Sequence, residues 1–157
     1  MLKYSSQTSQ HYWMNQISQL FIIFLLATSC IPSGENTSEL TSSVDRAAFL
    51  KGQTLYKQNC AQCHQANGAG LKKIYPPLAQ SDYLINNTSK AIQFIKHGTS
   101  EPIVVNGQRY AFNMPSNTHL SNEEIAQIMT YISNAWGNQA GTITIEDVQK
   151  ALNDSIP

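Results

Sequence analysis

The chain has 157 residues, of which 41% are hydrophobic and 13% are charged. This composition supplies enough apolar side chains for one packed domain with appendages, and it excludes a wholly disordered chain. Ten basic residues balance ten acidic ones, so the chain lacks the excess of positive charge that nucleic-acid binding requires. The three cysteines are an odd number, which excludes a simple disulfide scaffold.

The N-terminal part of the chain has the pattern of an export signal. Its unbroken apolar run, Leu20 to Ala27, is too short for a bilayer, which takes about 20 apolar residues. The small residues Thr28 and Ser29 follow and precede Cys30. We interpret residues 1–29 as a signal peptide in preference to a buried strand or helix, because polar residues dominate the next stretch.

Cys30 and its preceding residues resemble the cleavage box of bacterial lipoproteins, with the sequence Leu26-Ala27-Thr28-Ser29-Cys30. The resemblance implies that Cys30 is lipidated and becomes the first residue of the mature chain. Its acyl chains would tether the protein to a membrane. Residues 30–44 are mainly polar and small, which predicts a flexible linker before the next domain.

A helix is predicted directly after the linker. Asp45 can cap a helix that runs from Arg46 to about Gln58. Gly52 in its interior costs that helix up to about 1 kcal/mol. Two interpretations remain open: either another helix crosses closely at the glycine, or the glycine is merely tolerated.

The next segment carries the pattern for covalent attachment of c-type haem, Cys60-Ala61-Gln62-Cys63-His64. Two thiols at this spacing can add to the two vinyl groups on one haem edge. The following histidine then lies beneath the iron, where its Nε2 can bind axially. A thioredoxin-like pair would instead follow a strand. A zinc site would need one or two further ligands, and the only other cysteine is Cys30, the expected lipid anchor.

The middle of the chain predicts a second helix and a hairpin. Asn87 or Thr88 can cap a helix that Gly98 ends. Asn106-Gly107 lies between two short strand-like runs and is a strong hairpin signal.

Four residues are candidates for a second axial ligand of the iron: Met114, Met129, His97 and His119. Met129 falls on an apolar helical stripe and is predicted to be core. His97 precedes a helix-ending glycine, where histidine commonly interacts with free carbonyls. Met114 lies in a loop between asparagine and proline with no periodic pattern. We therefore expect Met114 to be the ligand, with His119 as the second choice.

Two further helices are predicted toward the C-terminus. Ser121 and Glu124 form a capping box for a helix whose apolar residues recur at helical spacing up to Trp136, with Gly137 closing it. Thr144 can cap a short helix in the tail.

In combination these motifs resemble class I cytochromes c, over about residues 46–137. The resembling segments, in family order, are Gly52 to Tyr56, Gly68 to Gly70, Tyr75 to Leu78, Asn113 to Pro115 and Tyr131 to Asn138. The resemblance implies an all-α fold of three to five helices around one covalently bound haem c. It also implies that the carbonyl of Pro77 accepts a hydrogen bond from Nδ1 of His64, and that Tyr131 or its neighbours cross Gly52.

The resulting organisation is a signal peptide (1–29), a linker (30–44), a cytochrome c domain (45–138) and a C-terminal tail (139–157). With both axial positions filled no substrate reaches the iron, so we predict an electron carrier and not an enzyme. Its expected place is the periplasm or the outer face of the cytoplasmic membrane, with redox proteins as partners. A terminal oxidase, a nitrite reductase or a dehydrogenase fits that role. A peroxidase or gas sensor with an open iron site, or a tethered thiol oxidoreductase, are the alternatives.

Overall fold

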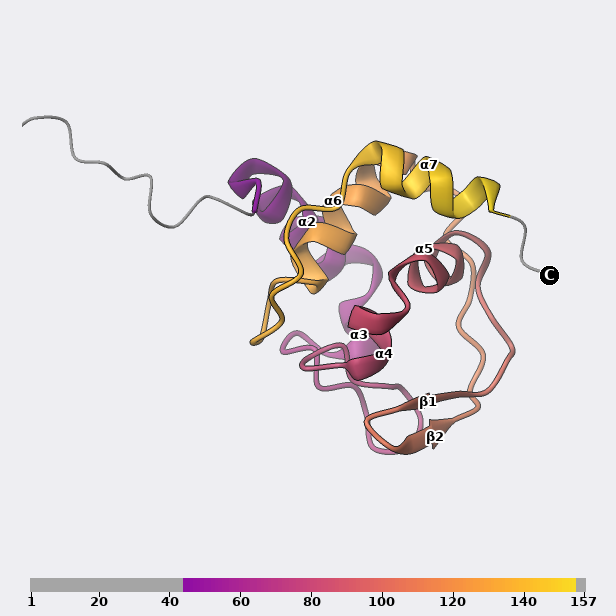
Figure 1. Cartoon of the computed structure of the whole chain (residues 1–157). Coiled ribbons are helices and arrows are strands. Elements are labelled where there is room, and N and C mark those ends of the chain that lie inside the picture. The colour runs from indigo at the N-terminus through magenta and orange to yellow at the C-terminus, as the bar shows by residue number, and fades with distance from the viewer. Residues whose placement is uncertain (1–43, 155–157) are drawn as a thin grey trace, which may run out of the picture. The chain divides into compact units, whose positions relative to one another are not determined.

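The computed structural model of the chain describes residues 44–154 (Figure 1). Cys30, the signal segment and nearly all of the linker lie outside the described residues. Six helices and a two-stranded antiparallel sheet make up the described part. The helices are α2 (Arg46–Asn59), α3 (Ala61–His64), α4 (Asp82–Asn86), α5 (Thr88–His97), α6 (Asn122–Ile132) and α7 (Ile145–Asn153), and the strands are β1 (Ile103–Val105) and β2 (Gln108–Tyr110). The predicted all-α class with a short hairpin is confirmed.

The predicted helix starts are confirmed: Asn87 precedes α5 without a side-chain capping bond, and the other three predicted helices start at side-chain caps. Oδ1 of Asp45 accepts from the first backbone amides of α2, at 2.8 and 3.0 Å. Ser121 and Glu124 form a reciprocal capping box at the start of α6. A second capping box, of Thr144 with Asp147, starts α7 in the tail. None of the helices between residues 44 and 154 is long and apolar enough to cross a membrane.

The end of α6 was predicted wrongly, because the helix stops at Ile132 and does not continue to Gly137. Two asparagine side chains bond carbonyls that a longer helix would have used. Nδ2 of Asn134 donates to the carbonyl of Thr130 at 2.7 Å, and Nδ2 of Asn138 donates to that of Ile132, also at 2.7 Å. Asparagine competes with the helix in this way, so the chain leaves α6 in turns.

The close crossing of α2 and α6 explains the glycine inside α2. A Cβ at Gly52 would overlap the carbonyl oxygen of Gln127 and lie 2.9 Å from Cβ of Tyr131. The expected crossing near Tyr131 is therefore confirmed, and only hydrogen fits between the two backbones. Aromatic rings surround this crossing: Tyr131 lies 5.1 Å from Phe49 and 5.4 Å from Tyr56, measured between ring centroids.

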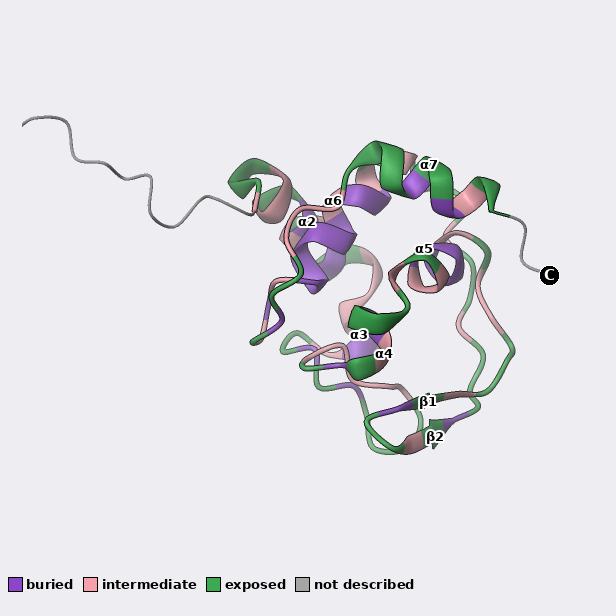
Figure 2. Ribbon diagram, in the orientation of Figure 1, coloured by how far each residue is buried: buried purple, intermediate pink, exposed green. Residues whose placement is uncertain are grey.

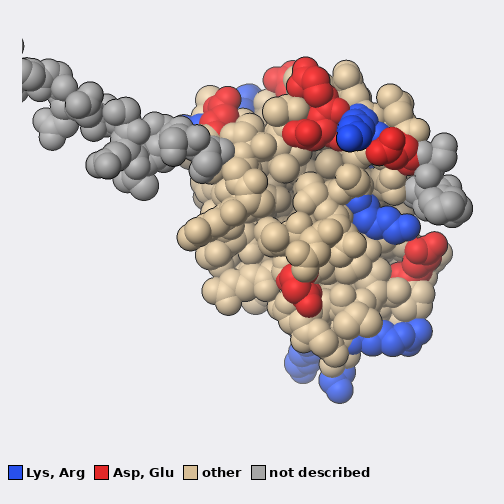
Figure 3. Space-filling model, viewed as in Figure 1, with Lys and Arg blue, Asp and Glu red and all other residues tan. Residues whose placement is uncertain are grey.

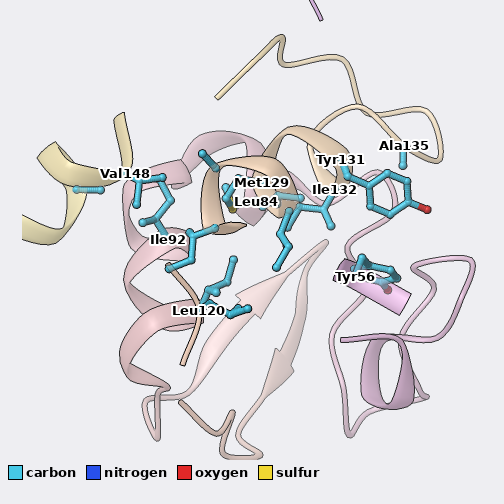
Figure 4. Close-up of a cluster of buried hydrophobic side chains, with 14 residues drawn as sticks. Tyr56, Leu84, Ile92, Leu120, Met129, Tyr131, Ile132, Ala135 and Val148 are labelled. Carbon is cyan, nitrogen blue, oxygen red and sulfur yellow. The ribbon is translucent and has the colours of Figure 1, made fainter. Parts of the chain in front are cut away.

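The hydrophobic core joins α2, α5, α6 and α7 (Figures 2 and 4). Met129 is fully buried in it, which confirms its prediction as core. Val148 and Ala151 bury one face of α7 against the domain, while the outward face of that helix is exposed. Figure 1 shows α7 at one end of the domain and the hairpin at the opposite end.

The hairpin pairs Ile103 with Tyr110 and turns at Asn106 and Gly107, both with positive φ, as predicted. A second set of contacts fixes this turn to the start of α4. The amide of Asn106 donates to Oδ1 of Asp82 at 2.7 Å, and the amide of Asp82 donates to Oδ1 of Asn106 at 3.0 Å. The hairpin is thus held at its tip as well as by its own ladder.

Candidate haem-binding site

The Cys-x-x-Cys-His motif forms the single-turn helix α3, which follows α2 after a break at Cys60. The amides of Cys63 and His64 donate to the carbonyl of Cys60, at 3.2 and 3.0 Å. This turn places both cysteines and the histidine on one short segment. Cys60 and Cys63 are half-buried free thiols, and His64 is buried.

His64 is oriented by a backbone carbonyl. Its Nδ1 lies 3.0 Å from the carbonyl oxygen of Pro76. Burial lowers the pKa of His64, and the hydrogen bond to Pro76 opposes this only in part. The ring is therefore neutral, Nδ1–H donates to Pro76, and the lone pair on Nε2 is left for a metal.

The acceptor expected for His64 was Pro77, and this is corrected to its neighbour Pro76. The reason is the tight turn that precedes the two prolines, in which the backbones of Leu71 and Tyr75 pair at 3.0 and 3.2 Å. Gly70 packs against the carbonyl of Pro76, leaving no room for a Cβ. The closed turn thus places the carbonyl of Pro76 within hydrogen-bond distance of the imidazole.

Two adjoining cavities surround the imidazole. Both are lined by His64 and Met114, and Cys60 lines the first while Cys63 lines the second. The walls of the first are mainly apolar and include Leu78, Leu84, Phe94, Ile95, Ile128 and Ile132. Apolar cavities with a few polar groups in their lining are typical of cofactor sites. The apolar walls, two thiols on one side and an available imidazole together fit a haem.

Met114 is positioned by its main chain. Its amide and carbonyl pair with those of Thr99, at 2.9 and 3.0 Å, directly after α5 ends at Gly98. A Cβ on Gly98 would lie 2.6 Å from the Met114 carbonyl oxygen, so this approach also requires glycine.

The other three candidate ligands lie elsewhere in the described part of the chain. Met129 is in the core, and His97 is exposed at the end of α5. His119 is exposed and its Nε2 lies 3.2 Å from Oδ1 of Asn59. Among the four, only Met114 lines either of the two cavities.

Cys60 lacks the electrostatic surroundings of a thiol catalyst. Burial raises the pKa of the Cys60 thiol to about 12, and Cys63 adds to the rise. Reactive thiols in oxidoreductases have a lowered pKa, because the thiolate is the nucleophile. The polypeptide therefore keeps Cys60 protonated, which disfavours a thiol oxidoreductase.

Tyr56 is a site residue that the sequence analysis did not identify. It is fully buried, lines the first cavity, and its hydroxyl donates to the carbonyl of Gln65 at 2.6 Å. Burial raises its pKa well above the ordinary value. Tyr56 thus fixes the chain directly after the motif. No local pattern indicates this bond, because Tyr56 and Gln65 lie on either side of the motif.

Comparisons with known proteins agree with this geometry. The family model described as cytochrome c matches residues 49–136. The cytochrome c subunit of a quinone alcohol dehydrogenase from Gluconobacter oxydans (strain 621H) is 28% identical over 95% of this chain and 33% of its own length. The corresponding subunit from Komagataeibacter europaeus is 32% identical over 78% of this chain and 26% of its own length. A cytochrome c-552 from Thermus thermophilus is 34% identical over 66% of this chain and 75% of its own length. The chain spans a third or less of the two dehydrogenase subunits.

Proposed function

Because the chain belongs to the cytochrome c family and binds haem c covalently, we propose that it is a monohaem carrier of single electrons between redox proteins. When bound, the haem supplies the reversible one-electron change of its iron. The residues of the chain hold the group, exclude water from it and fill the axial positions. The observation that carries this proposal is that His64 and Met114 line the same two cavities.

Each residue of the site has a distinct role in this proposal. Cys60 and Cys63 form the thioethers, and His64 is the axial ligand whose ring Pro76 orients. Met114 is the second axial ligand. A thioether is a soft ligand that favours ferrous iron, so it raises the reduction potential relative to a second histidine. With both positions filled, the site transfers electrons without bond chemistry.

A dehydrogenase is the partner that the relatives favour, since two of them are cytochrome c subunits of quinone alcohol dehydrogenases. The surface beside the cavities fits brief contact with such a protein. Tyr75 and Phe112 line the second cavity, with ring centroids 5.2 Å apart. Phe112 is 62% exposed, and Leu71 and Ile74, in the turn that leads to Tyr75, are 40% and 42% exposed. We call Leu71, Ile74, Tyr75 and Phe112 the apolar rim. Apolar surface of this kind marks protein contact sites.

Charge gives the apolar rim only modest help in attracting a partner. Lys72 and Lys73 lie between Leu71 and Ile74 and are exposed. Figure 3 shows basic side chains at the hairpin end of the molecule and acidic ones gathered at the α7 end. Association through a mainly apolar contact with two flanking cations depends weakly on salt.

Export and lipid attachment of Cys30 complete the proposal. The apolar run before Cys30 and the small residues next to it support a lipoprotein signal. The lipid would keep the domain at the outer face of the cytoplasmic membrane. Cys30→Ser is expected to move the cytochrome from the membrane fraction to the soluble periplasmic fraction, and its retention in the membrane would refute the anchor.

Absorbance of the purified protein tests the electron-carrier proposal. We expect a Soret band that survives acid–acetone extraction, because the haem is covalently bound. We also expect the weak far-red charge-transfer band of thioether-bound ferric haem, lost in Met114→Ala and kept in Met129→Leu. An extractable haem would refute covalent attachment. A band that is absent from the unchanged protein would refute a thioether ligand and favour an open-site peroxidase or gas sensor. A band that persists in Met114→Ala would assign the ligand to another methionine.

A further inference from the structure

Helix α5 is attached to α7 by a buried amide. Gln93 is 6% exposed, and its Nε2 donates to the carbonyls of Ala151 at 2.7 Å and Asp154 at 3.0 Å. These carbonyls lie at the C-terminal end of α7, where helix carbonyls lack partners within the helix. A buried amide is kept only when its hydrogen bonds are made, so this attachment depends on Gln93.

Helix α7 lies beyond residues 49–136, the part that matches the family model. Its residues Val148 and Ala151 are 0% and 1% exposed in the core cluster that includes Ile92 of α5. Figure 1 shows α7 running beside α5 and α6. The helix is therefore packed into the domain and is not a free appendage.

The other contacts of α5 lead to the segment that follows Met114. Nζ of Lys96 donates to the carbonyls of Thr118 at 3.1 Å and Leu120 at 2.7 Å. The carbonyl of Ile95 accepts from the amide and from Nδ2 of Asn117, at 3.0 and 3.2 Å. With the pairing of Met114 and Thr99, three successive attachments hold residues 114–120 against the C-terminal half of α5 and the residues just after it.

We propose that α7 braces Met114 against the haem iron through α5, and that Gln93 and Lys96 are positioning residues of this brace. The inference rests on the proposed function, in which Met114 is an axial ligand. Gln93 and Lys96 are one helical turn apart on α5. Loss of the α7 attachment lets α5 shift, and the Met114 loop moves with it because its hydrogen bonds end on α5 and on Thr99, which directly follows that helix. The sulfur then leaves the iron more often.

Capture of added imidazole by the ferric holoprotein measures how often the sulfur leaves. Imidazole binds the iron only after Met114 has dissociated, so at saturating imidazole the rate reports that step. In Gln93→Met, which keeps the side-chain length but makes neither hydrogen bond, we expect capture about tenfold faster. Lys96→Met should act in the same direction, since its bonds hold the loop side of α5.

The matched control is Asn134→Leu. Nδ2 of Asn134 also donates two hydrogen bonds to carbonyls, those of Thr130 and Gly141, both at 2.7 Å. Its Oδ1 also accepts from the amide of Gly141 at 2.9 Å, so the three bonds attach the turn after α6 to that helix and to the segment before α7, and none of them ends on α5. We expect Asn134→Leu to lower the melting temperature at least as much as Gln93→Met does, with imidazole capture within twofold of the unchanged protein.

A second variant approaches the brace from α7 itself. Val148→Ala removes buried apolar contact of α7 and changes no residue of α5. It should also accelerate imidazole capture. The brace is refuted if Gln93→Met and Val148→Ala lower the melting temperature yet leave capture as slow as Asn134→Leu does. If the unchanged protein lacks the far-red band, the ligand assignment fails instead, so the two failures are distinguishable.

Discussion

Gly52 of α2 lies against the main-chain carbonyl of Gln127 in α6, so closely that a Cβ on the glycine would overlap the oxygen. The crossing sets the distance between the two longest helices of the described domain. Because α6 contributes Ile128 and Ile132 to the cavity wall and α2 leads into the cysteine motif, this one contact also sets the depth of the haem cavity.

Gly52→Ala should therefore destabilise the folded protein by about 3 kcal/mol, since backbone atoms cannot move aside as a side chain does. Denaturant unfolding of the holoprotein measures the change. Gly107→Ala is the control, because it has a positive φ but open space around it, and should cost about 1 kcal/mol. Equal losses in the two variants would contradict the crossing as the cause.

Gly70→Ala should weaken the support of His64. A Cβ there would lie 2.7 Å from the carbonyl oxygen of Pro76, the acceptor for Nδ1 of His64. Moving this carbonyl makes the imidazole a weaker electron donor, so the reduction potential of the haem should rise. Redox titration followed by absorbance measures it.

The comparison for this variant is Gly68→Ala. It has a similar positive φ, but its Cβ would meet the ring of Trp136 at 2.5 Å instead of the proline carbonyl. We expect Gly68→Ala to lower stability without the same rise in potential. A rise of equal size in both variants would show that general loosening of the fold, and not the His64 hydrogen bond, controls the potential.

Asp82→Ala should free the tip of the hairpin. Oδ1 of Asp82 accepts from the amides of Asn106 and Tyr83, at 2.7 and 2.6 Å. We expect a loss of about 1–2 kcal/mol in unfolding free energy and faster proteolysis near Gly107. Nε2 of Gln108 donates to the carbonyl of its neighbour Arg109. Gln108→Ala should therefore change neither the unfolding free energy nor the proteolysis. Unchanged proteolysis in Asp82→Ala would show that the hairpin ladder alone holds the tip.

The capping box of α6 predicts a pH dependence of stability. Hydrogen bonds from the backbone and side chain of Ser121 lower the pKa of Glu124 in the folded state. The folded protein thus binds fewer protons than the unfolded chain. The box contributes fully above the unfolded pKa, and its contribution is lost as the pH falls through the lowered pKa.

Glu124→Gln keeps the hydrogen-bonding pattern of the box but does not titrate. Its melting temperature should therefore fall less than that of the unchanged protein as the pH is lowered from 5 toward 3, about the range in which a glutamate ordinarily titrates. Parallel melting curves over this range would remove Glu124 as a source of the acid sensitivity.

The apolar rim predicts how fast the protein exchanges electrons with a second copy of itself. Phe112→Ser removes a ring that is 62% exposed. It should slow electron exchange between ferric and ferrous protein about tenfold, which corresponds to a loss of about 1.4 kcal/mol in the free energy of association. Line broadening in mixtures of the two forms measures the rate. Leu50→Ser, on an exposed side chain of α2, should have no effect. Equal slowing by both would place the contact elsewhere.

Sequence reasoning succeeded where the signal is local. Asn106-Gly107 specified its turn because both residues tolerate positive φ, and Ser121 with Glu124 specified a helix start within four residues. Met114 was distinguished from Met129 by the absence of a helical pattern around it, and the cavities agree with that distinction.

The errors arose where hydrogen bonds that the residue pattern does not show decide the course of the chain. Trp136 continues the helical spacing of α6, yet side-chain hydrogen bonds of Asn134 and Asn138 end the helix earlier. Two adjacent prolines each have a carbonyl that could accept from His64. The closed turn before them decides that the carbonyl of Pro76 does so. Asp82 and Asn106 are 24 residues apart, so no local pattern could have paired them.

The backbone pairing of Met114 with Thr99 has a consequence for how this protein can change over evolution. Main-chain amide and carbonyl groups make those two bonds, and every residue except proline offers the same pair. The loop therefore keeps its course whichever side chain stands at position 114. A single substitution there changes the side chain that faces the iron while the fold of the loop is kept. The reduction potential of the protein can therefore change under selection in one mutational step.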